Sequence, residues 1–279
     1  MEGKMSELKI VFAYGMTISH DQMEDGRIYL DGACRGPAID NQRKAYSFDH
    51  HANCLRFATL ATCQQVMTAL ELGFDPSGLQ VVLNGLDADS SLSLWLLRNP
   101  EKTQAPEVRT IVEHIGFVDA HGPVRPSVKL LSCLNRSPRI PQTIDMLWED
   151  QNKIDMWFNG GDDALPKPFS FPPCPAFGLT QSGELLKFDT TDDFGTLYNA
   201  GCVVAVLIAE GPEGTKGYSI GKRSDFVSYD IARFMTEMNK LEPGWGGGST
   251  IGGAPRLEGG LRSSLSVEVV KRVFVEVSR

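Results

Sequence analysis

The chain has 279 residues, a formal net charge of −8 and 42% hydrophobic residues, a composition typical of a globular protein with one large or two ordinary domains. The excess of acidic residues argues against electrostatic binding to duplex DNA. The sequence contains no apolar run of roughly 18 residues, which a membrane span would require. It also lacks the features of a secretory signal. Its six cysteines are scattered without a Cys-x-x-Cys pair, so we expect reduced thiols in a cytoplasmic protein.

The first part of the chain alternates between segments typical of strands and a segment typical of a helix. Strands are predicted at residues 8–14, 27–30 and 43–48, which are rich in β-forming residues. Residues 57–72 repeat apolar side chains at helical spacing. Residues 79–86 are almost entirely apolar, as a parallel strand buried on both faces should be. This order predicts an α/β fold built on a parallel sheet.

Two histidines follow a carboxylate at the end of the third predicted strand, in the stretch Asp49-His50-His51. The carboxyl ends of parallel strands are where α/β sheets build sites. Two loop histidines that face water would be the simpler interpretation. The adjacent Asp49 favours a metal site, because a carboxylate commonly orients a metal-binding imidazole.

Acidic residues also follow two other predicted strands. Asp31 comes directly after residues 27–30, and Asp87 and Asp89 come after residues 79–86. Asp31 is either a metal ligand or a turn residue whose side chain caps the backbone. Asp89 or Ser90 is either part of a site or an ordinary helix N-cap, but an N-cap at either position does not explain Asp87.

The middle of the chain offers one further acidic candidate and then changes in character. Residues 108–123 predict a helix that runs into a turn carrying Asp119. Residues 126–196 are rich in proline and flank an amphipathic segment at 143–158. We expect that segment to serve core packing or to act as a strut between domains.

The last third predicts a second mixed unit. Residues 202–209 and 218–224 predict a hairpin, residues 229–238 a helix and residues 265–277 a valine-rich strand. Between the last two, residues 244–256 contain six glycines. Such a run is either a flexible linker or a set of backbone amides that approach an anion closely.

The stretch Phe48-Asp49-His50-His51 resembles the signature of the DHH phosphoesterase superfamily. Asp87 to Ser93 resembles the first motif of that superfamily, Asp-x-Asp-x-x-x-Ser, although Leu83 stands where a histidine is usual. Here this motif follows the Asp-His-His instead of preceding it. Either the motifs are circularly permuted, which we favour, or Asp87 to Ser93 stands for the last motif and the first is degenerate around His20.

The end of the chain resembles the DHH-associated C-terminal domain. Arg223-Ser224, then Asp230 before a helix, then Gly246-Gly247-Gly248 follow the order of that domain. The family's glycine cluster usually continues into a histidine, and this chain has Ser249-Thr250 instead.

The resemblance implies a parallel-sheet, DHH-like domain at 1–125, a helical and Pro-rich connector at 126–196, and a smaller α/β substrate-binding domain at 197–279, with the active-site cleft between the two domains. It also implies roles for individual residues. The metal ligands would be Asp31, His50, Asp87, Asp89 and Asp119. Asp49 would orient an imidazole, and His51 would contact the phosphate or protonate the leaving oxygen. The substrate phosphate would be held by Arg223, Ser224, Gly246, Gly247, Gly248, Ser249, Thr250 and Arg256.

Carboxylates with one imidazole suit Mn²⁺, two ions being expected, with Mg²⁺ or Co²⁺ as alternatives. The implied activity is hydrolysis of short oligonucleotides or small nucleotide phosphoesters, and Trp245 and Phe226 near the glycines favour a substrate with a base. The alternatives are a pyrophosphate or polyphosphate hydrolase and a non-catalytic nucleotide-binding module. The sequence leaves the oligomeric state open, a homodimer included.

Overall fold

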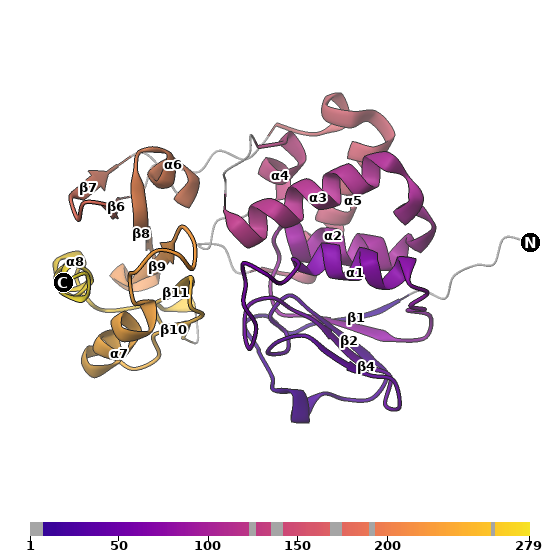
Figure 1. Cartoon of the computed structure of the whole chain (residues 1–279), viewed down its shortest axis with the longest axis horizontal. Helices are drawn as coiled ribbons and strands as arrows, with labels where there is room; N and C mark the ends of the chain where they lie inside the picture. Colours follow the sequence, from indigo (N-terminus) through magenta and orange to yellow (C-terminus); the bar gives the residue numbers. More distant parts are fainter. Residues whose placement is uncertain (1–7, 123–126, 135–141, 168–174, 190–192, 258–259) are drawn as a thin grey trace, which may run out of the picture. The chain divides into compact units, whose positions relative to one another are not determined.

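The computed structural model describes residues 8–122, 127–134, 142–167, 175–189, 193–257 and 260–279. The chain divides into two compact units (Figure 1). The first comprises residues 1–121, 125–136 and 142–169, and the second comprises 122–124, 137–141 and 170–279.

A five-stranded sheet forms the centre of the first unit. Its strands lie in the order β1 (Lys9–Phe12), β5 (Gln80–Leu83), β2 (Arg27–Leu30), β4 (Ala45–Phe48) and β3 (Ala38–Asp40). The first four are mutually parallel, and β3 pairs with β4 in the antiparallel sense at one edge. The predicted α/β class with a parallel sheet is confirmed.

The helices of this unit lie on one side of the sheet (Figure 1). They are α1 (Thr62–Glu71), α2 (Ala88–Arg98), α3 (Pro106–His121), α4 (Lys129–Leu134) and α5 (Ile144–Ala164). Alternate strand residues divide between the two faces: Ile28 and Leu30 of β2 belong to the helix-covered core, whereas Tyr29 belongs to a smaller cluster on the other face. Successive side chains of a strand point to opposite faces of the sheet, so neighbouring residues of β2 pack in different clusters.

The predicted connector at 126–196 is divided between the two units. Its helices α4 and α5 pack in the first unit, where Leu147 and Ile154 of α5 are fully buried. These two residues lie seven positions apart and therefore on one helical face, and α5 contacts α2 through that core. The amphipathic segment thus serves core packing, which was one of its two expected roles.

A six-stranded antiparallel sheet forms the second unit, in the order β10-β11-β9-β8-β6-β7. Its strands are β6 (Ala176–Thr180), β7 (Leu185–Phe188), β8 (Cys202–Glu210), β9 (Lys216–Lys222), β10 (Gly246–Gly247) and β11 (Ile251–Gly253). Its helices are α6 (Phe194–Asn199), α7 (Ile231–Leu241) and α8 (Val267–Val277). The predicted hairpin is confirmed as β8 and β9, which pair over seven positions.

The predicted strand at 265–277 is wrong, because this segment is helix α8. Its valines favour a strand by composition. However, Val270, Val273, Phe274 and Val277 are the buried residues, and their spacing is that of one helical face. Burial of that face on the sheet outweighs the weaker strand preference of β-branched side chains.

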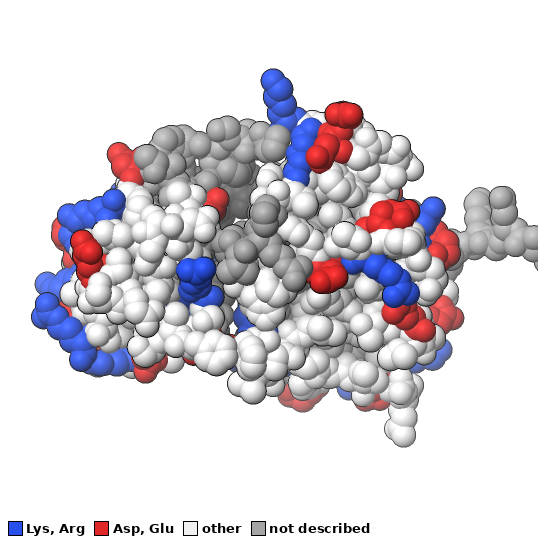
Figure 2. Space-filling view, turned by 45° about the horizontal axis from the view of Figure 1, so that its top comes forward, with Lys and Arg blue, Asp and Glu red and all other residues white. Residues whose placement is uncertain are grey.

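On the face drawn in Figure 2, acidic and basic side chains are interspersed over both units. Among the described residues, none of the helices combines the length and the apolar character that crossing a membrane would require.

Candidate metal centre

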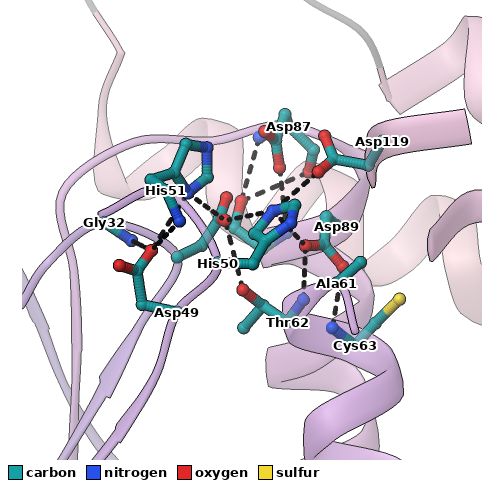
Figure 3. Close-up of polar contacts among 12 residues, drawn as sticks. Gly32, Asp49, His50, His51, Ala61, Thr62, Cys63, Asp87, Asp89 and Asp119 are labelled. Atoms are coloured by element: carbon teal, nitrogen blue, oxygen red, sulfur yellow. Dashed lines mark hydrogen bonds and ion pairs between the residues drawn. The ribbon is translucent and has the colours of Figure 1, made fainter. Parts of the chain in front are cut away.

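The candidate centre lies at the carboxyl ends of three neighbouring strands. Asp31 follows β2, His50 and His51 follow β4, and the loop after β5 leads to Asp87. Since β5, β2 and β4 are adjacent and parallel, their ends meet at one edge of the sheet. Figure 3 shows the side chains of His50, His51 and Asp87 converging, with Asp89 from α2 and Asp119 from α3 completing the cluster.

His50 lies at the middle of the cluster and is 0% exposed. Its Nε2 is 2.8 Å from Oδ2 of Asp119, and 3.7 Å from both Oδ1 of Asp31 and Oδ2 of Asp89 (Figure 3). Apart from these ion-pair contacts, neither ring nitrogen has a hydrogen-bond partner among the described residues. A buried imidazole that faces three carboxylates has the surroundings of a metal ligand.

Asp89 is 1% exposed and is held by the first turn of α1. The backbone N–H of Thr62 donates to its Oδ2 at 2.8 Å, and that of Cys63 donates to its Oδ1 at 2.7 Å. Burial and the neighbouring charge of Asp119 nevertheless raise the pKa of Asp89 to about 6. Asp89 therefore links the site to the positive end of α1.

Asp87 is the residue that caps α2. Its Oδ1 accepts a hydrogen bond from the N–H of Ser90 at 2.9 Å, and Ser90 Oγ accepts one in return from the N–H of Asp87. The helix cap expected at Asp89 or Ser90 is thus at Asp87. Its charge still acts on the cluster, since it helps to raise the pKa of Asp31.

Asp31 adopts a left-handed backbone conformation, with φ of 47°. Its carboxylate accepts a hydrogen bond from Thr62 Oγ1 at 3.2 Å and lies 3.3 Å from Nδ1 of His51. Burial raises its pKa well above the ordinary value, and the charges of Asp87 and Asp89 add to the effect. Asp31 is therefore a member of the cluster. It also lies in a turn, but the hydrogen bond that its carboxylate accepts comes from Thr62 and not from the backbone of that turn.

Asp49 accepts several hydrogen bonds and orients His51. The N–H groups of Gly32, Gly36 and His51 donate to its two oxygens at 3.0, 2.6 and 3.0 Å, and Nδ1 of His51 lies 3.0 Å from Oδ1. Burial opposes ionisation, but the hydrogen bond and the charge of His51 outweigh it and lower the pKa of Asp49 to about 2. Asp49 thus lies against the ring of His51, and its role in orienting an imidazole stays a prediction.

Asp119 lies in the last turn of α3, not in the turn predicted after a helix. A carboxylate there is disfavoured by the negative end of the helix dipole. Arg56 compensates, since its Nη2 donates to both Oδ2 and the carbonyl oxygen of Asp119. Burial raises the pKa of Asp119, but the charge of Arg56 and the contact with His50 together hold it below its usual range.

Two groups of three residues have ligand atoms close enough to bind one ion each. The first group is Asp31, His50 and His51, and the second is His50, Asp89 and Asp119. Within each group the ligand atoms lie within 4.8 Å of one another, and both groups include His50. Carboxylate oxygens and imidazole nitrogens suit Mn²⁺ or Mg²⁺ better than a soft metal. Four of the five expected ligands are thus brought together, and Asp87 stands beside them as a helix cap.

Several residues that hold the centre in place were not predicted from the sequence. Gln142 clamps the loop before Asp87, since its Oε1 accepts from the N–H of Leu86 at 2.7 Å and its Nε2 donates to the carbonyl oxygen of Leu86 at 2.9 Å. Asn84 bridges two loops, donating to Thr17 Oγ1 and to the carbonyl oxygen of Gly32. These contacts span 52 to 67 residues of sequence, and no local pattern marks them.

The glycine-rich segment of the second unit is a β-hairpin. β10 pairs with β11, and the N–H of Gly248 donates to the carbonyl oxygen of Ile251 at 2.7 Å. A Cβ on Gly247 would lie 2.2 Å from Cα of Gly252, so the glycines allow a close approach of two strands. The linker alternative is therefore wrong for residues 246–253, and the amide of Gly248 is already used within the hairpin.

The other predicted substrate-binding residues belong to the same unit. Ser249 Oγ donates to Asp225 at 3.2 Å, and the carbonyl oxygen of Thr250 accepts from the N–H of Lys222 at 2.8 Å. Arg223 and Arg256 are exposed, and Ser224 is half-buried. Their role toward a substrate stays a prediction.

No family model, curated protein or solved structure matches this chain. The likeness to the DHH superfamily therefore stays a prediction, carried by the motifs quoted above and by the place of their residues in the cluster.

Proposed function

We propose that the chain is a divalent-metal-dependent phosphoesterase whose metal centre is the cluster around His50. The observation that supports this proposal best is His50 itself, fully buried, without a hydrogen-bond partner in the described part of the chain, and facing three carboxylates. Burying such a set of like charges is unfavourable unless cations compensate them. We expect Mn²⁺, with Mg²⁺ or Co²⁺ as substitutes.

When bound, two divalent ions would supply a water of lowered pKa and stabilise negative charge on phosphorus. The side chains of the chain then have distinct roles. His50, Asp31, Asp89 and Asp119 would hold the ions. Asp49 fixes the ring of His51 through Nδ1, and we assign the proton to Nδ1 because the partner is a carboxylate. Nε2 of His51 is then the atom that would contact the phosphate or, when protonated, donate to the leaving oxygen.

The proposed substrates are short oligonucleotides or small nucleotide phosphoesters. One observation favours pyrophosphate or polyphosphate as the second candidate. Trp245, which was expected to offer a stacking surface for a base, is only 4% exposed and packs in the core of the second unit. Phe226 is 78% exposed and is the remaining aromatic candidate of that pair.

The test is a hydrolysis panel on the full chain with added Mn²⁺. The substrates are dinucleotides, cyclic dinucleotides, nucleotide bisphosphates and pyrophosphate. We expect turnover of at least one of them, and a loss of about a hundredfold or more in His51→Ala, as for removal of a general acid. Asp75→Ala is the control, because it removes an exposed ionisable residue in the turn before β5, outside the cluster.

Equal activity in His51→Ala and the wild type would refute the assignment of the site. Metal and nucleotide binding without turnover of any substrate would refute the enzyme and leave the non-catalytic module as the function.

A further inference from the structure

Arg56 is a cation beside the metal cluster that the proposed function does not use. It lies in the segment between β4 and α1, and its side chain is 14% exposed. Its Nη2 donates to the carbonyl oxygen of Asp119 at 3.0 Å and to Oδ2 of the same residue at 3.1 Å. One side chain thus holds both the backbone and the carboxylate at the end of α3.

The contacts with Asp119 use one nitrogen of the guanidinium group. An arginine side chain carries five N–H donors in a planar fork. In the described part of the chain, Nε and Nη1 of Arg56 make no hydrogen bond. A largely buried guanidinium with unused donors is able to bind a further acceptor, and its geometry matches phosphate.

Arg56 lies at the edge of the metal cluster, where it contacts Asp119. Oδ2 of Asp119 lies 3.1 Å from Nη2 of Arg56 and 2.8 Å from Nε2 of His50. A single oxygen therefore separates the guanidinium from the central imidazole. A group bound at His50 and Asp119 would be within reach of the arginine fork.

We infer that Arg56 is an anion-binding residue of this site, whose Nη2 holds Asp119 while the free N–H groups of Nη1 donate to an oxyanion of the phosphorylated substrate. The inference rests on the proposed function for the identity of that substrate, and it adds a phosphate contact within the first unit. It needs no contribution from the arginines of the second unit.

The test measures binding of inorganic phosphate by calorimetry, on the full chain saturated with Mn²⁺. Arg56→Lys keeps the charge and one donor toward Asp119 but removes the fork, and Arg56→Ala removes all of them. We expect Arg56→Lys to weaken phosphate binding about tenfold, the effect of losing a charge-assisted hydrogen bond, while its Mn²⁺ affinity changes by less than about threefold. Arg109→Lys is the matched control, because Arg109 forms an ion pair with Glu71 outside the cluster.

The outcomes separate the inference from the proposed function. Phosphate affinity that is unchanged in both Arg56 variants, or absent in the wild type, would overturn the inference even if phosphoesters are hydrolysed. Phosphate binding that depends on Arg56 in a protein that hydrolyses no ester would support the inference and refute the proposed enzyme. Equal Mn²⁺ affinity and equal urea unfolding of Arg56→Lys and the wild type would show that the effect is not structural.

Discussion

The hydrogen bonds of Asp49 predict a measurable loss of stability when its charge is removed. The carboxylate is 1% exposed and accepts from the backbone of Gly32, Gly36 and His51. Its pKa is lowered from 3.8 to about 2. At about 1.36 kcal/mol per pKa unit, this difference corresponds to roughly 2 kcal/mol of stability at pH 7. We expect Asp49→Asn to lower the free energy of unfolding of the first unit by about that amount.

The pH dependence follows from the sign of the shift. Because the folded-state pKa lies below the unfolded one, the contribution of Asp49 is complete above pH 3.8 and is lost as the pH falls through about 2. The difference between wild type and Asp49→Asn should therefore be present at pH 5 and should fall to about half near pH 3.

The measurement is urea unfolding in EDTA, read by pulsed amide hydrogen exchange of residues 27–52, so that only the first unit is followed. Asp75→Asn is the control, since Asp75 is an exposed aspartate that accepts from the N–H of Ser77, and such surface changes usually stay within about 0.5 kcal/mol. Equal stability of Asp49→Asn and the wild type at pH 7, or a difference that grows toward low pH, would refute this account.

Three further predictions concern the metal centre. His50→Ala should abolish the rise in thermal midpoint that Mn²⁺ gives the wild type, about 2.7 kcal/mol of stabilisation at a hundred times the Kd; an equal rise by calorimetry would contradict His50 as a ligand. Because the pKa of Asp89 is raised to about 6 and the pKa of Asp31 is raised as well, a metal must displace protons at low pH, so Mn²⁺ affinity in titrations should fall by at least tenfold per pH unit below about 6. Gln142→Ala removes both hydrogen bonds to the backbone of Leu86 and should weaken Mn²⁺ binding by up to about tenfold. An unchanged affinity would show that these hydrogen bonds are not needed for metal binding.

The sheet and most of the cluster could be predicted because their signals are local. A buried strand is an apolar run, and a polar residue directly after it lies at the carboxyl edge of the sheet. Asp31, His50 and Asp89 were found in this way. The resemblance then pointed to Asp119, although the residue lies within α3 and not beyond it.

The parts that could not be predicted depend on contacts between distant segments. Asp89 accepts from the N–H groups of Thr62 and Cys63 across 27 and 26 residues, respectively, so a residue of α2 holds the start of α1. The error at α8 has a different cause. The valine content of this segment favours a strand, whereas the spacing of its apolar residues favours a helix, and burial of that helical face determines the structure. The role of Trp245 was wrong for the same reason, since its burial in the core follows from packing and not from its neighbours in sequence.

The strand order of the first unit has a consequence for biosynthesis. β2 is flanked by β5 and β4, both of which come later in the chain, and β1 pairs with β5. While the ribosome has released only the first 79 residues, β1 has no neighbour and β2 has one open edge, which is an aggregation hazard. A truncated product that ends before β5 should therefore need chaperone protection. Release of β5 pairs both β1 and β2, and α2 and α3, which follow it, deliver Asp89 and Asp119.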